Sequence, residues 1–219
     1  MEIRTEAKKM KLSAPVLAAS TMEQRNRALD CIAVALREHE TEIFAANKKD
    51  MEYAESKQIA QSIQKRLKYD ENKLRDSISG VLELKELSDP IGKVLMHRQL
   101  DEGLILKKIS VPIGVIGVIF EARPDAMIQV ASLCIKSGNC AILKGGKETA
   151  NTNKVLFEII KNAVIEAGLP AECLLQAELH NEIDELLKCD NDVDLLIPRG
   201  SNQFVRYIME NTKIPVMGH

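Results

Sequence analysis

Three turns in the second half of the chain carry the residue types that bind anionic ligands. They are residues 121–124, 144–147 and 198–201, and each follows an apolar run and precedes a helix-length segment. Glycine lets a phosphate approach the backbone, and the amides at a helix start favour an anion. Because strand ends meet at one edge of a parallel sheet, the pattern predicts a site for a phosphate-bearing ligand there.

The last turn has both a functional and an ordinary structural interpretation. Gly200 would admit a pyrophosphate to the backbone, and Arg199 would add a charge-assisted bond. Glycine and serine are also common where helices begin, so Gly200 and Ser201 could be helix-entry residues only. At the first turn, Arg123 could hold a phosphate or carboxylate by two bonds, or it could form a surface salt bridge with a neighbouring acid.

The middle turn is rich in glycine and lysine: Lys144, Gly145, Gly146 and Lys147. It contains neither a Walker loop nor G-x-G-x-x-G, and lysines near turns are usually solvated. Two glycine-bearing turns in one sheet nevertheless favour a nucleotide ligand.

An alternating α/β layer must position these turns. The predicted strands are 113–120, 140–144, 174–177, 193–197 and 214–217. The predicted helices between them are 124–137, 149–167, 182–188 and 201–211. This order indicates an α/β fold with a doubly wound, mostly parallel sheet and right-handed crossovers.

The first half of the chain is predicted to be helical and to end in a hairpin. One helix covers 2–20, a capping box at Thr21 and Gln24 begins the next, and Asp70 caps another. Strands 94–100 and 104–110 then flank the turn 101–103. This hairpin is either a surface arm packed on its own domain or an oligomerisation arm. We therefore divide the chain into a helical part (1–92), the arm (93–110) and a Rossmann-like part (111–219).

Composition excludes several classes of function. The 219 residues carry a net charge of −2 and only 3 % aromatic residues, so neither nucleic acid nor an anionic membrane is an expected partner. No apolar run is long enough to span a bilayer. The five cysteines form no C-x-x-C pair, and the histidines, His97 and His180 among them, show no metal-ligand spacing. We expect neither a metal nor a disulfide, inert thiols at Cys134 and Cys140, and a reducing cytoplasm.

Three segments resemble the γ-glutamyl phosphate reductase family, also called glutamate-5-semialdehyde dehydrogenases, of the aldehyde dehydrogenase superfamily. They read VPIGVIGVIFEARP (111–124), LCIKSGNCAILKGG (133–146) and LLIPRGS (195–201). The resemblance implies an aldehyde dehydrogenase-like cofactor domain and NADPH-dependent reduction of L-glutamyl 5-phosphate to L-glutamate 5-semialdehyde in proline biosynthesis. It also implies a cytoplasmic homo-oligomer, with glutamate 5-kinase as a further partner.

The same resemblance implies roles for particular residues. Lys144 would contact the adenosine ribose, and Gly145 and Gly146 would line that turn. Lys147 stands where many NAD-using relatives have an acid, and a cation there favours the 2′-phosphate of NADP(H). Arg199, Gly200 and Ser201 would lie near the pyrophosphate. Arg123 would contact the substrate or the developing oxyanion, whereas Asp125 departs from the Asn that is usual in the family.

The family reaction proceeds through a cysteine thioester. The resemblance places the nucleophilic cysteine after His219, together with the catalytic domain, so we expect this chain alone to be inactive. Two alternatives stay open. The chain could be a non-catalytic nucleotide-binding or assembly module, or it could be another aldehyde dehydrogenase relative that uses an internal cysteine.

Overall fold

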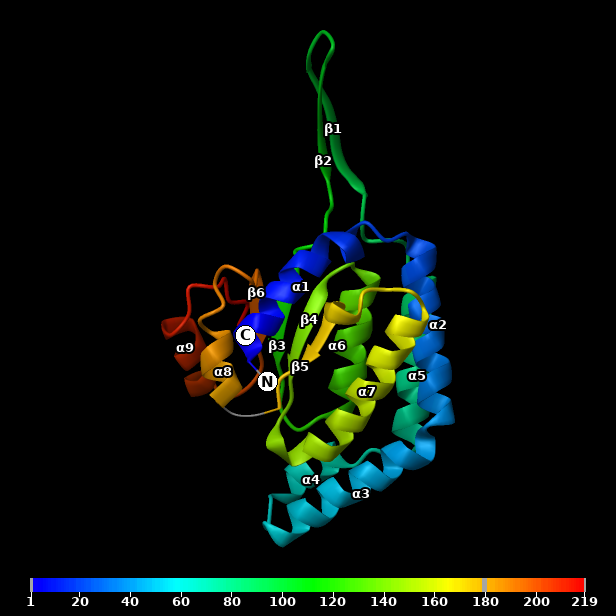
Figure 1. Cartoon of the computed structure of the whole chain (residues 1–219), viewed down its shortest axis with the longest axis vertical. Coiled ribbons are helices and arrows are strands. Elements are labelled where there is room, and N and C mark those ends of the chain that lie inside the picture. Colours follow the sequence, from blue (N-terminus) through cyan, green and yellow to red (C-terminus); the bar gives the residue numbers. More distant parts are fainter. Residues whose placement is uncertain (1, 179–180, 219) are drawn as a thin grey trace.

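A four-stranded parallel sheet forms the centre of the molecule (Figure 1). The computed structural model describes residues 2–178 and 181–218. The strands are β3 (Val115–Ile119), β4 (Cys140–Lys144), β5 (Leu174–Gln176) and β6 (Leu195–Pro198), in the order β5-β4-β3-β6. All their pairings are parallel, and β3 and β4 are buried throughout. The predicted fold class is confirmed.

Helices cover both faces of this sheet. Helices α6 (Pro124–Lys136) and α7 (Ala150–Glu166) contact each other and pack against β4 and β5 on one face. Helix α1 (Ile3–Ala18) contacts β3, β4 and helix α8 (Asn181–Leu186) on the other. Helices α2 (Met22–Glu38) and α5 (Glu71–Glu86) form a further layer outside α6 and α7 (Figure 1). The main cluster of buried apolar residues draws on both halves of the chain, so the N-terminal helices share the core of the sheet.

The remaining helices lie at the ends of the sheet. Helix α3 (Glu40–Ser56) contacts α7 and the short helix α4 (Gln61–Leu67), and α9 (Asn202–Glu210) follows β6. Two 3₁₀ turns, η1 (Lys147–Thr149) and η2 (Ala171–Cys173), precede α7 and β5. Within the described ranges 2–178 and 181–218, no helix combines the length and the apolar character needed to cross a membrane.

The local predictions in the first half are confirmed. Thr21 and Gln24 form the capping box of α2, and the Asp70 side chain caps α5 by accepting from the Lys73 amide. The hairpin consists of β1 (Val94–Asp101) and β2 (Leu104–Ile109), paired antiparallel.

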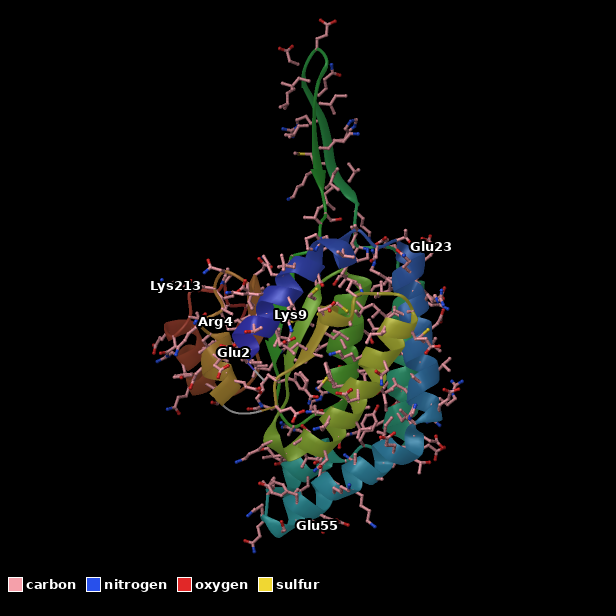
Figure 2. The ribbon with its side chains drawn as sticks, in the orientation of Figure 1. Glu2, Arg4, Lys9, Glu23, Glu55 and Lys213 are labelled. Atoms are coloured by element: carbon pink, nitrogen blue, oxygen red, sulfur yellow. The ribbon has the colours of Figure 1, made fainter. Side chains whose placement is uncertain are left out.

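The hairpin extends away from the body as a free arm (Figures 1 and 2). Of its strand residues only Met96 is even partly buried. The alternative in which the arm packs on its own domain is therefore wrong. That it joins two copies of the chain stays a prediction, as does the division at residues 92 and 110.

Three strand predictions need correction. The strand predicted at 193–197 begins two residues later, at Leu195. The strand predicted at 214–217 is reduced to one parallel bridge between Leu196 and Val216, so its position beside β6 is right but its length is not. Strand β3 begins two residues later than predicted, because the amides of Ile113 and Gly114 donate to the Asn139 side-chain oxygen (2.7 and 2.9 Å) and not to a strand. His180 and His219 lie outside the described residues.

Candidate functional site

The three predicted turns meet at the carboxyl edge of the sheet. The Arg199 amide donates to the Ile119 carbonyl (2.7 Å), and the Phe120 amide donates to the Lys144 carbonyl (2.9 Å). The chain runs from β3 through β4 to β5 in one direction, and β6 then lies on the opposite side of β3. The ends of β3 and β6 therefore form the topological switch point, where open α/β sheets bind their ligands.

Close approach of the backbone explains the glycines in these turns. A Cβ on Gly145 would overlap the side-chain amide of Asn153. A Cβ on Gly200 would lie 3.3 Å from Glu121 Oε1 and 3.0 Å from the Phe204 ring. Both positions are thus tightly packed, and a larger residue would have to displace these side chains.

The start of α7 is already occupied by a carboxylate of the protein. Asp50, on α3, is 2 % exposed and accepts from the Asn151 amide (3.1 Å) and side chain (2.8 Å). It also accepts from the Thr152 amide (2.8 Å) and hydroxyl (2.5 Å). These are the amides that a phosphate would use at this helix start. The turn at 144–147 can therefore contact a ligand through its side chains, but α7 offers no open anion site.

The other helices that begin at this edge differ from one another in how open their first turn is to an anion. Helix α6 begins with Pro124, which has no amide hydrogen, followed by Asp125, and α8 has Glu182 and Asp184 in its first turn. Helix α9 has no acid in its first turn. The Ser201 hydroxyl accepts from the Phe204 amide (3.3 Å), which leaves the earlier amides of α9 for a ligand. Of the four α-helices that follow a described strand of this sheet, α6, α7, α8 and α9, the start of α9 best suits a diphosphate.

The two lysines of the middle turn differ in exposure. Lys144 is buried, and its ammonium group donates to the Gly145 carbonyl (2.8 Å). Burial lowers the pKa of Lys144, and the nearby carboxylates of Glu182 and Glu148 partly oppose that change. Lys147 is exposed in η1, at the outer end of the turn. A cation at that position is accessible to a ligand, whereas Lys144 must rotate away from its own turn to reach one.

Arg123 forms a salt bridge with Asp125. This is the structural role that the sequence offered as the alternative to ligand binding. The Arg123 Nη2 lies 2.7 Å from Asp125 Oδ2, and this hydrogen bond and charge raise the pKa of Arg123. The Arg123 side chain is nevertheless 60 % exposed, against 15 % for Asp125. The guanidinium is therefore accessible, with part of its charge neutralised by the neighbouring carboxylate.

A groove of about 900 Å³ borders two of these turns, at 121–123 and at Arg199. One wall is apolar and comes from β3, α6 and β6: Ile116, Val118, Phe120, Ala126, Val130 and Ile197. The polar end is formed by Arg66, Glu121, Arg123 and Arg199. Arg66 belongs to α4, and sequence reasoning missed it because no local pattern connects α4 with the end of β3.

None of the five cysteines is prepared for nucleophilic attack. Four are buried and Cys31 is half-buried. Burial raises the pKa of Cys134 and of Cys140 to about 12, and it raises the pKa of Cys173 and Cys189 as well. Cys134 borders the groove, but a thiol with that pKa is almost entirely protonated at neutral pH. Their expected inertness fits this burial.

The sequence profile described as the aldehyde dehydrogenase family matches residues 1–217. The chain belongs to the aldehyde dehydrogenase family. It is 48 % identical to a gamma-glutamyl phosphate reductase of Acetivibrio thermocellus over 219 residues, which are 100 % of this chain and 51 % of that protein. The chain spans about half the length of the curated relatives it matches.

Solved structures within the family are similar throughout the chain. A gamma-glutamyl phosphate reductase of Saccharomyces cerevisiae superposes with a TM-score of 0.94 at 38 % identity, covering 100 % of this chain and 56 % of the other. The same enzyme of Thermotoga maritima gives a TM-score of 0.94 at 30 % identity, covering 99 % and 53 %. The sequence resemblance is thereby confirmed, and family members of this kind are oxidoreductases that use NAD(P).

Proposed function

We propose that this chain is the NADP(H)-binding half of a γ-glutamyl phosphate reductase, the enzyme that reduces L-glutamyl 5-phosphate to L-glutamate 5-semialdehyde in proline biosynthesis. The observation that carries the proposal is the convergence of the three turns on the switch point between β3 and β6. The names of the relatives support the choice of substrate.

The cofactor would lie across this edge. The open amides of α9, with Gly200, Ser201 and Arg199, would bind the diphosphate. Lys144 and the backbone of Gly145 and Gly146 would line the adenosine ribose. Lys147 would pair with a 2′-phosphate, and for this reason we propose NADP(H) and not NAD(H).

The substrate would occupy the groove. Arg123 would face the acyl phosphate and stabilise charge on its carbonyl oxygen. The bound dinucleotide supplies the hydride that reduces the acyl carbon. The apolar wall from β3 and α6 would keep water away from the reacting group. The reaction needs a thiolate, and the raised pKa values of the buried cysteines count against the alternative of an internal nucleophile.

We further propose that the whole protein is a cytoplasmic homo-oligomer. The arm has two exposed strands with unpaired edges, which can pair with a strand of another copy. An association with glutamate 5-kinase would bring the unstable acyl phosphate to the groove directly.

Cofactor binding to the chain itself tests the proposal. NADPH and NADH fluorescence would be titrated with the wild type, with Lys147→Gln, and with the control Lys154→Gln on exposed α7 surface. We expect NADPH to bind at least about tenfold more tightly than NADH, and Lys147→Gln to remove that difference, since a charge-assisted bond contributes about 1.4 kcal/mol or more. The control should behave as wild type. A folded sample that binds neither dinucleotide would refute the cofactor proposal.

A further inference from the structure

The groove has a second accessible arginine that the predicted site does not include. Arg66 lies on α4, more than fifty residues before Arg123 in the sequence, yet both border the polar end of the same groove. Within the described residues 2–178 and 181–218, the Arg66 guanidinium forms no hydrogen bond or ion pair, whereas the Arg123 guanidinium is bound to Asp125 at 2.7 Å. Arg66 therefore has its N–H donors available for a ligand.

The backbone around Arg66 is held firmly in place. Leu67 is fully buried and packs with Ala122 and Ala54 in a small separate cluster, which fixes α4 against the end of β3. The side-chain amide of Asn47 donates to the Leu67 carbonyl and its oxygen accepts from the Tyr69 amide, both at 2.8 Å. Because the backbone is fixed, binding at Arg66 costs only the freedom of its side chain and no further ordering of the helix.

Charge balance gives this arginine a role. The proposed substrate is an acyl phosphate of an amino acid, with a phosphoryl group at one end and an α-carboxylate at the other. One arginine cannot bind both ends, and Arg123 already shares its charge with Asp125. A planar guanidinium matches either anion by two parallel bonds. A second cation is needed. Arg199 is assigned above to the diphosphate, which leaves Arg66 as the other arginine that borders this groove.

We propose that Arg66 binds one anionic oxygen group of the substrate, the phosphoryl or the α-carboxylate, and so is a specificity-determining residue of the groove. This inference rests on the proposed function for the identity of the substrate. The binding of an oxyanion at Arg66 can nevertheless be measured without cofactor or turnover.

The test is an NMR titration of the ¹⁵N-labelled chain, following the arginine Nε–Hε signals at constant ionic strength. Inorganic phosphate and glutarate serve as separate probes for the two ends of the substrate. We compare the wild type with Arg66→Gln and with Lys65→Gln, a matched control on the same helix that loses a charge outside the groove.

We expect one probe to shift the Arg66 signal until it saturates. Arg66→Gln should weaken the binding of that probe to the chain about tenfold, because a charge-assisted bond is lost. Lys65→Gln should leave the affinity unchanged. Saturation by phosphate assigns Arg66 to the phosphoryl end, and saturation by glutarate assigns it to the carboxylate end. The proposal is overturned if neither probe shifts the signal, or if both arginine and lysine variants weaken binding equally. The NADPH titration above stays independent of this result, so either proposal can fail alone.

Discussion

Replacing Asp50 by Asn should destabilise the protein far more than its single changed atom suggests. The carboxylate accepts two bonds on each oxygen, from Asn151 and from Thr152. An amide can accept on one side only, so its NH₂ group would face a backbone amide and leave that buried donor unpaired, at a cost of about 2 kcal/mol. Loss of the negative charge at the start of α7 adds about 1 kcal/mol.

The expected decrease in the free energy of unfolding is therefore about 3 kcal/mol, which lowers the melting temperature by about 6–12 °C in a chain of this size. Urea unfolding followed by circular dichroism measures it. The matched control is Glu52→Gln, two residues along α3, where the carboxylate is exposed and lies 4.0 Å from Lys48. An Asp50→Asn variant as stable as this control would refute the assignment of Asp50 as the cap of α7.

Three further predictions use the same unfolding assay or simple labelling. Thr21→Ala removes the capping box of α2 and should cost about 1 kcal/mol of stability in urea unfolding. Asp89→Asn leaves Arg25, 1 % exposed, without its ion pair at 2.7 Å and should cost about 3 kcal/mol, whereas a loss below about 0.5 kcal/mol would contradict a buried charge there. A thiol reagent at neutral pH should modify half-buried Cys31 first. Because burial raises the pKa of Cys134 to about 12, its labelling should accelerate with every unit of pH above neutrality, and fast labelling of Cys134 at neutral pH would contradict that pKa.

Features that depend on neighbouring residues were predictable from the sequence. The capping box at Thr21, the Asp70 cap and the hairpin turn at 101–103 all depend on contacts within a few residues, and all three are present. The order of strands and helices after residue 113 follows from the same kind of local pattern. The fold class could therefore be derived before the structure was known.

Features that depend on distant contacts were not predictable. No pattern indicates that Asp50 contacts Thr152, 102 residues away, or that α4 places Arg66 beside the end of β3. The strand expected at 214–217 illustrates the same limit, because β-propensity alone cannot tell how much of a segment pairs with its neighbouring strand. The bridge of Val216 to Leu196 consists of two backbone hydrogen bonds, from the Leu196 amide to the Pro215 carbonyl and from the Met217 amide to the Leu196 carbonyl, both at 2.8 Å.

The contrast between α7 and α9 explains why glycine-bearing turns overestimate the number of phosphate sites. Both helices follow an apolar strand and a turn with glycine, so the sequence pattern predicts an anion site equally at each. An anion site also needs amides that no internal acceptor has taken. Asp50 takes those of α7, whereas the cap of α9 is a neutral hydroxyl bound to a later amide. If the proposed function is right, a carboxylate from a distant helix decides which of two similar turns receives the diphosphate, and the other turn would contact the ligand through its lysines.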